Sequence, residues 1–361
     1  MSDKIGVALI GCGGIVIQNH LPGLRYCMGA ELTALCDSNE QVLSQASNDT
    51  GVTRVTTNFE DIFEMEEVDA IIIATPNFLH APCAIGAAKA GKHVLCEKPL
   101  SMDLAEARLM YETAEAAGVR HMTAFTYRFV PGMRYMAHLV QDGFLGTPYH
   151  FRCRRQQDWG IRNLGWRQVR KLASTGEIGD MLSHRIDFAH LLMGPIRELV
   201  ADTRIFVPER GGQVSDLDDW VGVIAHFDNN ATGMLESTKV ATGRGEGGLS
   251  EDFCEIVGSE GTLIYRLGNP NHVLIGRKGS SSLEEVRVPM EFLKVPGTPR
   301  DANQGDPVQV FRYDQDFEFI QAIREDRPCS PSFADGVKVA AVIDAILEST
   351  EHRKWVSLER G

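Results

Sequence analysis

The first third of the chain alternates short apolar runs with stretches of helical spacing, and this alternation constrains the fold more than any other feature. Six strand-sized runs are rich in apolar or β-branched residues: KIGVALI, ELTALC, RVTT, DAIIIAT, KHVLC and VRHMTAF. Between them, alanine and leucine recur at helical spacing in residues 39–49, 79–90 and 103–117. Strands that alternate with helices form parallel βαβ units, with helices on both faces of one sheet. The sequence therefore predicts an α/β fold with a doubly wound parallel sheet at its N-terminal end.

One helix of this region has both of its ends marked in the sequence. Asp103 can cap a helix over 104–117, and Glu106, three residues on, can complete a capping box. Gly118 is suited to end the helix because glycine adopts the left-handed conformation that follows many helices. The continuously apolar run DAIIIAT is typical of a central parallel strand, which is buried on both faces.

The pattern changes after about residue 124. We expect helices at 131–142 and at about 179–193, the second amphipathic, with a basic strand YHFRCRRQ between them. From 196 to 290 the chain is rich in strands, with hairpins expected about DNN and SEG. A long loop over 292–310 and two helices, near 311–325 and 335–350, follow. These runs predict an α+β domain with a large open, mostly antiparallel sheet.

The loop GCGGIVIQNH, residues 11–20, follows the first predicted strand and precedes a helix. Gly11 and Gly13 match the first two glycines of the G-x-G-x-x-G dinucleotide motif, in the strand–loop–helix context that the motif requires. Val16 holds the third position, where glycine normally lets the helix pack closely on its strand. We predict a Rossmann domain and treat Val16 as a packing variant that sets the first helix slightly farther from the strand. The predicted pyrophosphate contacts are Gly11 and Gly13, and Gly14 and Ile15 are further predicted cofactor contacts.

Asp37 ends the second strand, 21 residues beyond Val16. An acidic residue at this distance accepts hydrogen bonds from the ribose hydroxyls of NAD. Its charge would repel the 2′-phosphate of NADP, and no Arg or Lys follows directly, so NAD is the predicted cofactor. The alternative is that Asp37 caps the helix over 39–49.

Composition excludes several other classes of protein. The net charge of −13 disfavours general binding to nucleic acid or to anionic membranes, and the apolar runs are too short to span a bilayer. The N-terminus reads as a first strand and not as a secretion signal. The eight cysteines are scattered, with no C-x-x-C and no Cys/His cluster at zinc spacing. They predict reduced, mostly buried thiols, a cytoplasmic location and no metal site.

An ordered set of further motifs carries a family resemblance. Thr75, Pro76 and His80 form a T-P-x-x-x-H stretch, and Glu97, Lys98 and Pro99 form an E-K-P motif. TYRFVPGMRYMAHLVQDGFLGTP, QDWGIRNLGWR and STGEIGDMLSHRIDFAHLLMG follow in order. The chain thereby resembles the Gfo/Idh/MocA family of NAD(P)-dependent sugar and cyclitol oxidoreductases over essentially its whole length. The resemblance implies an NAD-binding Rossmann domain over 1–123 and a substrate-binding and oligomerisation domain over 124–361.

The resemblance also implies an active site made of Lys98 and a D-x-x-x-H pair, Asp180 and His184. Residues four apart lie on one helical face, so the pair can point the same way. His184 would act as the base that removes the hydroxyl proton, since the pKa of histidine suits that work near neutrality. Lys98 would bind the reacting oxygen, and Asp180 would orient a neighbouring hydroxyl or the histidine. The alternatives are a solvated lysine at a strand end and a hydrogen-bonded pair on a helix surface.

Further residues match the family's binding elements. The expected cofactor contacts beyond the glycine loop and Asp37 are Thr75, Pro76, Asn77, His80, Glu97, Lys98, Tyr127 and Arg128. The expected substrate contacts from the resemblance are Lys98, Tyr127, Asp158, Trp159, Trp166, Arg167, Asp180 and His184. Arg152 and Arg154 are added as expected substrate contacts because they belong to a basic stretch that goes beyond the family. Asp187 and His190 are interpreted as structural. The chain departs from the family where STGEIGD keeps only Gly176 and Gly179 of a glycine-rich run, a change expected to reshape the substrate pocket.

Residues 120–185 are strongly basic, with eleven Lys or Arg against four acids. One hypothesis is that some of these cations bind a carboxylate, sulfonate or phosphate on the substrate. The candidates are Arg152, Arg154, Arg155, Arg162 and Lys171. The alternative is a solvated strand face or a subunit interface with acidic partners.

Three functions are compatible with these residues. The leading one is an NAD-dependent dehydrogenase of a sugar, sugar acid or cyclitol, the substrate being neutral or anionic. The second is a glycosidase that uses bound NAD for transient oxidation at C3, elimination, water addition and re-reduction. The third is an NAD-sensing regulator, which the retained Lys98, Asp180 and His184 disfavour. The open sheet would leave one face to bury, so we expect a homodimer or homotetramer.

Overall fold

The computed structural model describes residues 4–160 and 164–358. Its contacts gather the chain into two units, and the first contains the chain up to Thr126 together with Val295–Arg300 and Arg312–Ala340. The second contains Tyr127–Lys294, Asp301–Phe311 and the chain from Ala341. The sequence assigned all of 124–361 to one domain, whereas two C-terminal segments pack with the first unit. Arg300 and Asp314, both buried, join these segments to each other, with Nη2 2.6 Å from Oδ2.

The first unit is built on six parallel strands, as the alternating pattern predicts. The strands are β1 Ile5–Ile10, β2 Ala30–Cys36, β3 Val55–Thr56, β4 Ala70–Ile73, β5 His93–Cys96 and β6 His121–Thr123. Their order in the sheet is β3-β2-β1-β4-β5-β6. The direction of winding reverses between β1 and β4, and open α/β sheets bind ligands at the carboxyl ends of the strands at such a switch point. All of β4 is buried, as its continuously apolar sequence predicts.

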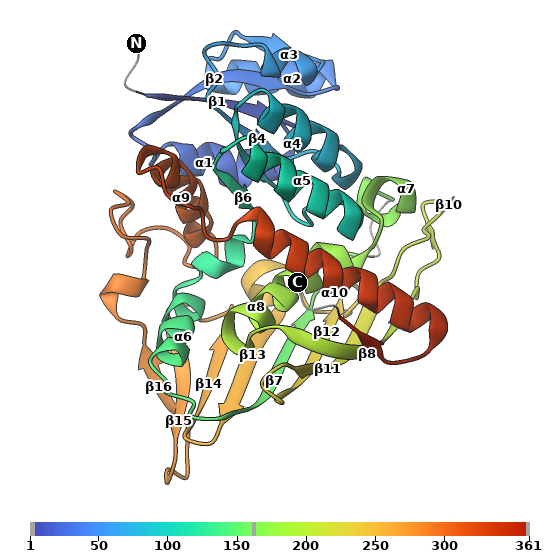
Figure 1. Cartoon of the computed structure of the whole chain (residues 1–361), viewed down its shortest axis with the longest axis vertical. Helices are drawn as coiled ribbons and strands as arrows, with labels where there is room; N and C mark the ends of the chain where they lie inside the picture. Colours follow the sequence, from blue (N-terminus) through green and yellow to red (C-terminus); the bar gives the residue numbers. More distant parts are fainter. Residues whose placement is uncertain (1–3, 161–163, 359–361) are drawn as a thin grey trace. The chain divides into compact units, whose positions relative to one another are not determined.

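Helices pack on this sheet between the strands. They are α2 Glu40–Thr50, α3 Glu60–Phe63, α4 His80–Lys89 and α5 Leu104–Ala116. Near the end of the chain, α9 Tyr313–Arg324 belongs to the same unit, and the first part of α10, Phe333–His352, adds Phe333 and Ala340 to its core. Figure 1 shows α4 and α5 side by side. Asp103 caps α5 by accepting the N–H of Glu106 at 2.8 Å, and Gly118 follows with φ +67°. Both predicted ends of this helix are confirmed.

The first helix is irregular where the sequence predicts a regular one. A π-helical turn over Val16–His20 leads into the short α1, Leu21–Leu24, in which Pro22 occupies the first turn. A π turn widens the helix by one residue, and such turns occur frequently at functional sites. Residues 16–20 therefore point in directions that helical spacing alone does not predict.

The second unit contains a nine-stranded sheet. The strands, in sheet order, are β16 Glu284–Arg287, β15 His272–Arg277, β14 Gly261–Arg266, β13 Glu251–Gly258, β7 Pro148–Gln156, β12 Thr232–Thr238, β11 Trp220–Phe227, β8 Ile196–Arg204 and β17 Val356–Ser357. Only the β7–β12 pair is parallel among the pairs of these strands. A separate pair consists of β9 Glu209–Arg210 and β10 Gln213–Val214. The hairpins about DNN and SEG are confirmed as β11–β12 and β13–β14.

One face of the large sheet is covered by helices. α8, Ser183–Met193, packs on β7, while α6, Pro131–Gln141, packs on β14 and β15 (Figure 1). The expectation that the helix near 179–193 is amphipathic is wrong, since α8 is buried on nearly all sides. Its sequence reads as amphipathic because it carries charges such as Arg185, but this guanidinium is itself buried against Asp252.

No helix in the described ranges is long and apolar enough to cross a membrane.

Candidate functional site

The glycine loop of the first unit is shaped by contacts with the neighbouring strand end. Gly11 has φ +90°, and a Cβ placed on it would lie 2.6 Å from the carbonyl oxygen of Ala74, which follows β4. A Cβ on Gly13 or Gly14 would instead meet nothing within 4 Å. Gly11 is therefore required by the protein's own packing, whereas Gly13 and Gly14 leave open space at the carboxyl end of β1. Open space beside bare backbone N–H groups is what a dinucleotide pyrophosphate needs.

Asp37 lies beside this loop at the end of β2. Its Oδ2 accepts the N–H of Cys12 at 2.8 Å, and its Oδ1 accepts the N–H of Asn39 at 2.8 Å. The cap of α2 is Asn39, whose side chain accepts the N–H groups of Gln41 and Val42, so the alternative of Asp37 as the cap is wrong. Because each carboxylate oxygen has two acceptor positions, Asp37 can still accept a ribose hydroxyl. The loop and Asp37 together fit NAD.

His80 links the turn after β4 to the turn after β5. Its Nδ1 lies 2.8 Å from the carbonyl oxygen of Pro99, and its Nε2 lies 3.1 Å from that of Thr75. Burial lowers the pKa of His80, although the carbonyl oxygens of Pro99 and Thr75 oppose this effect. The structure thus places His80 behind the T-P and E-K-P turns, where it holds them together. Asn77, also buried, begins the short 3₁₀ turn between them.

The E-K-P motif forms the turn that follows β5. The Lys98–Pro99 peptide is cis, and the N–H of Lys98 lies 3.2 Å from Oε2 of Glu97. The other carboxylate oxygen of Glu97 faces Nε2 of His20 at 3.2 Å. Since β1, β2, β4 and β5 are parallel, their carboxyl ends gather the glycine loop, Asp37, the T-P turn and Lys98 at one edge of the sheet.

In the second unit, His184 is buried under Tyr127. The His184 side chain belongs to α8 and is 2% exposed, and the two ring centroids lie 4.6 Å apart at 60°. The guanidinium of Arg185 lies over the Tyr127 ring, 5.0 Å from its centroid. Tyr127 is thus packed between an imidazole and a buried cation, and this packing fixes the orientation of the His184 ring.

Asp180 lies in a π-helical turn, Ile178–Leu182, that leads into α8. Its Oδ1 is 3.5 Å from Nε of Arg167, and the Arg167 guanidinium stacks on Trp166, 4.2 Å from a ring centroid. Three predicted substrate contacts, Trp166, Arg167 and Asp180, are therefore brought together, although the π turn was not predicted.

Gly176, one of the two glycines kept in STGEIGD, precedes this turn. A Cβ on Gly176 would lie 2.2 Å from the carbonyl oxygen of Asp218. The carboxylate of Asp218 accepts the N–H groups of Gly176 and Ile178 at 2.7 and 2.9 Å. These contacts hold the chain on both sides of Glu177.

Glu177 was not predicted as a site residue. It is fully buried, and its Oε1 accepts a hydrogen bond from Oγ of Ser237 at 2.5 Å. Burial, reinforced by the negative charges of Asp180 and Asp218 and opposed by Lys239, raises the pKa of Glu177 to about 8. A carboxyl group that keeps its proton near neutrality beside Asp180 is a candidate functional group. A signal was available, because Glu177 is the only charged residue between Ser174 and Gly179.

Asp158 and Trp159 are fixed against the segment after β12. Oδ2 of Asp158 accepts the N–H of Gly243 at 2.9 Å, and Nζ of the buried Lys239 lies over the Trp159 ring, 5.5 Å from a ring centroid. Lys239 also pairs with Asp219 at 3.7 Å. Trp159 and Glu177 therefore share a neighbour in Lys239.

Arg128, expected near the cofactor, makes a bidentate ion pair with Asp187. Its Nε and Nη2 lie 2.8 and 2.5 Å from the two carboxylate oxygens. Asp187 thus has the structural role predicted for it, and Arg128 braces α8 from the segment before α6.

Arg152 and Arg154 lie on the face of the sheet opposite to His184. Side chains alternate along β7, and the buried residues between these two face α8. Arg152 pairs with Glu255 at 2.6 Å, and Arg154 pairs with Glu251, both carboxylates coming from the neighbouring strand β13. The structure does not bring either arginine together with His184. It favours the alternative of a solvated strand face, on which both arginines pair with carboxylates of this chain.

The other basic residues of this stretch lie in different surroundings. Arg155 is buried and pairs with Asp252 at 3.0 Å, and Arg185 pairs with the same carboxylate. Lys171 lies exposed on the short α7, Arg170–Ala173. Arg162 lies outside the described residues.

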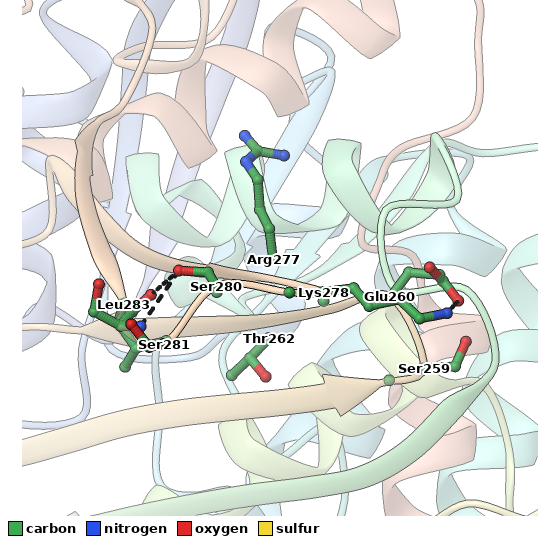
Figure 2. A pocket seen from close by; sticks show the side chains of 13 residues that line it. Ser259, Glu260, Thr262, Arg277, Lys278, Ser280, Ser281 and Leu283 are labelled. Carbon is green, nitrogen blue, oxygen red and sulfur yellow. Dashed lines mark hydrogen bonds and ion pairs between the residues drawn. The ribbon is translucent and has the colours of Figure 1, made fainter.

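A shallow pocket of about 420 Å³ lies between the β13–β14 and β15–β16 hairpins. Figure 2 shows Ser280, Ser281 and the paired Lys278 and Glu260 among its lining residues. Nζ of Lys278 lies 2.8 Å from Oε1 of Glu260. None of the pocket's described lining residues is a predicted site residue, so it is not part of the candidate active site.

Comparisons with known proteins agree with this geometry. Residues 5–125 match the Gfo/Idh/MocA family described as "Oxidoreductase family, NAD-binding Rossmann fold". Residues 133–264 match the "GFO/IDH/MocA C-terminal domain". Levoglucosan dehydrogenase of Pseudarthrobacter phenanthrenivorans is 30% identical over 90% of this chain and 88% of its own length. The chain belongs to the Gfo/Idh/MocA oxidoreductase family.

One further relative and one solved structure match the chain over nearly its whole length. Myo-inositol 2-dehydrogenase of Thermotoga maritima is 27% identical over 99% of this chain and 98% of its own length. A solved structure of levoglucosan dehydrogenase in complex with NADH and levoglucosan has a TM-score of 0.91 and 29% identity, over 99% of this chain and 100% of that one. The predicted fold class, enzyme class and NAD cofactor are confirmed.

Proposed function

We propose that this protein oxidises a hydroxyl group of a sugar or cyclitol by hydride transfer to NAD. The observation that carries the proposal is the grouping of Asp180, the Arg167–Trp166 stack and the buried His184–Tyr127 pair around one turn and helix. Carbohydrates present hydroxyls and apolar C–H faces together, and charged donors and acceptors beside aromatic rings suit both. The levoglucosan and myo-inositol relatives support this substrate class.

Each residue has a defined task in the proposed reaction. His184 removes the proton of the reacting hydroxyl, and Tyr127 holds its ring in place. Lys98 stabilises negative charge on the reacting oxygen, and Asp180 accepts a hydrogen bond from a neighbouring hydroxyl. NAD, when bound at the glycine loop and Asp37, supplies the hydride acceptor.

The basic residues also bear on whether the substrate is neutral or anionic. Arg152, Arg154 and Arg155 hold carboxylates of this chain, so an uncharged sugar or cyclitol is the leading substrate class in the proposal. Arg167 is half-exposed and is the cation through which an anionic sugar would be recognised.

A substrate screen tests the proposal. Purified protein and NAD are mixed with levoglucosan, myo-inositol, neutral hexoses, glucuronate and glucose 6-phosphate, and with aryl glycosides of the neutral and anionic sugars. NADH absorbance and release of the aryl group are recorded together. NADH formation with a free sugar supports the dehydrogenase, whereas aryl release without net NADH supports the redox glycosidase and overturns the proposal.

We further propose a homodimer or homotetramer that forms through the open face of the nine-stranded sheet. Ile224 and Met234 are 47% and 51% exposed on neighbouring strands of this face, beside Trp220 and Phe253. Two shallow cavities of about 680 and 420 Å³ flank Arg154 there. A broad apolar surface edged by ion pairs suits a second copy of the chain.

We also propose a cytoplasmic location. All eight cysteines are buried thiols with no disulfide. Protein purified without a reductant should release eight reactive thiols per chain on denaturation. A deficit would indicate disulfides and contradict a reducing compartment.

A further inference from the structure

His20 ends the π turn of the first helix and is completely buried, yet the proposed mechanism gives it no task. Its two ring nitrogens face two carboxylates. Nδ1 is 2.7 Å from Oδ1 of Asp316 on α9, and Nε2 is 3.2 Å from Oε1 of Glu97 in the E-K-P turn. All three residues belong to the first unit, and 296 positions separate His20 from Asp316.

We propose that His20 is a positioning residue for the catalytic lysine: it bridges Asp316 to Glu97 and thereby fixes the turn that presents Lys98. This inference rests on the proposed function for the role of Lys98. The bridge itself rests only on the geometry of His20, Glu97 and Asp316.

The bridge between the two carboxylates requires His20 to be protonated, that is, an imidazolium. Only the protonated ring can donate from both nitrogens, one donor to each carboxylate. Burial lowers the pKa of His20, but Asp316 and then Glu97 outweigh burial and raise it to about 10. Burial would raise the pKa of Glu97, but the hydrogen bond and charge of His20, with Lys98, bring it below its usual value. Asp316, Glu97 and Lys98 are the charged groups that act on this cluster, and Cys27 is a titratable neighbour of Asp316.

The surrounding backbone is adapted to the bridge. A Cβ on Gly23 would lie 2.1 Å from Oδ2 of Asp316, so α1 can approach this carboxylate only with glycine at that position. The π turn supplies the other adaptation, since its extra residue changes the direction of the His20 side chain relative to a regular helix. On the far side of Glu97, its Oε2 faces the backbone N–H of Lys98 at 3.2 Å. A continuous set of contacts therefore runs from α9 to the backbone of Lys98.

Removing His20 would leave two buried carboxylates without a shared cation. They would repel each other, or one would take up a proton, and in either case Glu97 would lose its fixed position. The proposed contacts of the substrate with Asp180 and His184, and of NAD with the glycine loop and Asp37, would remain. The defect should therefore be in turnover more than in binding.

The test compares His20→Gln, Glu97→Gln and the double variant with a matched control, His121→Gln. His121 is also a buried histidine of the first unit, 2.8 Å from the carboxylate of Glu115, and neither its Glu115 nor its Phe333 hydrogen bond involves the E-K-P turn. Hydrogen exchange of the amides of residues 97–101, apart from Pro99, which has no N–H, and the Kd of NADH are measured for all four. Where the screen finds a substrate, kcat and KM are measured as well.

We expect His20→Gln to raise the exchange rates of residues 97–101 at least about tenfold and to lower kcat at least about tenfold, with little change in KM or in the Kd of NADH. Glu97→Gln should raise the same exchange rates and lower kcat to the same extent, and the double variant should be no worse than either single one. His121→Gln should change neither readout.

A second expectation concerns pH. A histidine whose pKa is raised on folding stabilises the protein fully below its unfolded pKa of about 6.5, and this contribution is lost as pH rises toward about 10. The stability advantage of the wild type over His20→Gln should shrink across that interval.

An unchanged exchange rate at residues 97–101 in His20→Gln overturns the bridge. A normal kcat with faster exchange overturns the link to Lys98. A wild type that oxidises no polyol contradicts the proposed function and leaves the exchange result to decide the bridge.

Discussion

Gly11 and Gly13 stand two positions apart and are glycines for different reasons. Gly11 has a positive φ and lies against the carbonyl of Ala74, so the fold itself needs it. Gly13 faces open space, so the packing of the chain does not require it, and the proposed pyrophosphate site gives it a role. The same distinction separates Gly176, which packs on Asp218, from the ligand-facing positions. Positions whose residue type the packing of the chain does not require are therefore the better candidates for contact with a ligand.

The two glycines therefore predict opposite behaviour. Gly11→Ala should lower the thermal unfolding temperature, because its Cβ would lie too close to Ala74 and its φ is unfavourable for alanine. Gly13→Val should unfold at the wild-type temperature but bind NADH at least about tenfold more weakly. Differential scanning fluorimetry and NADH fluorescence titration measure the two effects. Normal NADH binding by Gly13→Val would contradict the assignment of the pyrophosphate site.

Glu177 predicts a pH dependence of stability. Its pKa is about 8 in the folded protein and near 4.5 when unfolded, so the folded state holds the extra proton between these values. Stability is then lost as pH rises through this interval, by up to about 1.4 kcal/mol per pH unit. Glu177→Gln keeps the hydrogen bond to Ser237 without the proton, so its urea midpoint should match the wild type near pH 4.5 and exceed it at pH 8. Parallel curves for the two proteins would contradict a protonated Glu177.

At the scale of elements, periodicity and caps predicted most of what the structure contains. Apolar runs located β1, β2, β4 and β5, and the Asp103 cap and Gly118 located both ends of α5, because these signals are local. The two π turns were missed because each adds one residue to a helix, and such an insertion leaves no periodic trace. Both turns carry site residues, His20 in one and Asp180 in the other.

The first π turn also bears on Val16, the residue in place of the third glycine. Val16 is 1% exposed and lines a cavity of about 730 Å³ beside Leu9, Leu35 and α2, in agreement with a packing role. Val16→Ala should cost on the order of 2 kcal/mol of stability and leave the Kd of NADH within about threefold of the wild type. Chemical denaturation and NADH titration check the two values. A collapse of NADH binding would mean that the loop was misinterpreted.

At the scale of the whole molecule, the sequence could not pair residues far apart. Arg152 and Arg154 looked like anion ligands because their acidic partners, Glu255 and Glu251, lie about a hundred positions away. Asp316 could not be joined to His20 for the same reason, nor could α9 be assigned to the first unit. The motifs that the family resemblance supplied, Lys98 and the Asp180–His184 pair, were found because each is local.

The open sheet face makes a prediction about assembly. Ile224→Arg with Met234→Arg puts two charges into the proposed apolar contact, so sedimentation velocity should show a smaller species than the wild-type dimer or tetramer. The double variant should still fold, because both side chains are half-exposed in a single chain and the substitutions disturb no core packing. A cooperative thermal unfolding transition would show this. A wild type that sediments as a monomer would contradict the proposed interface.

The most direct test of the central claim is NADH formation by the wild type and by Lys98→Met with levoglucosan, myo-inositol and the other sugars of the screen. The account predicts that the wild type forms NADH with at least one free sugar or cyclitol. Lys98→Met should lose at least about a hundredfold in kcat. The absence of NADH with every polyol tested, or full turnover by Lys98→Met, would contradict it.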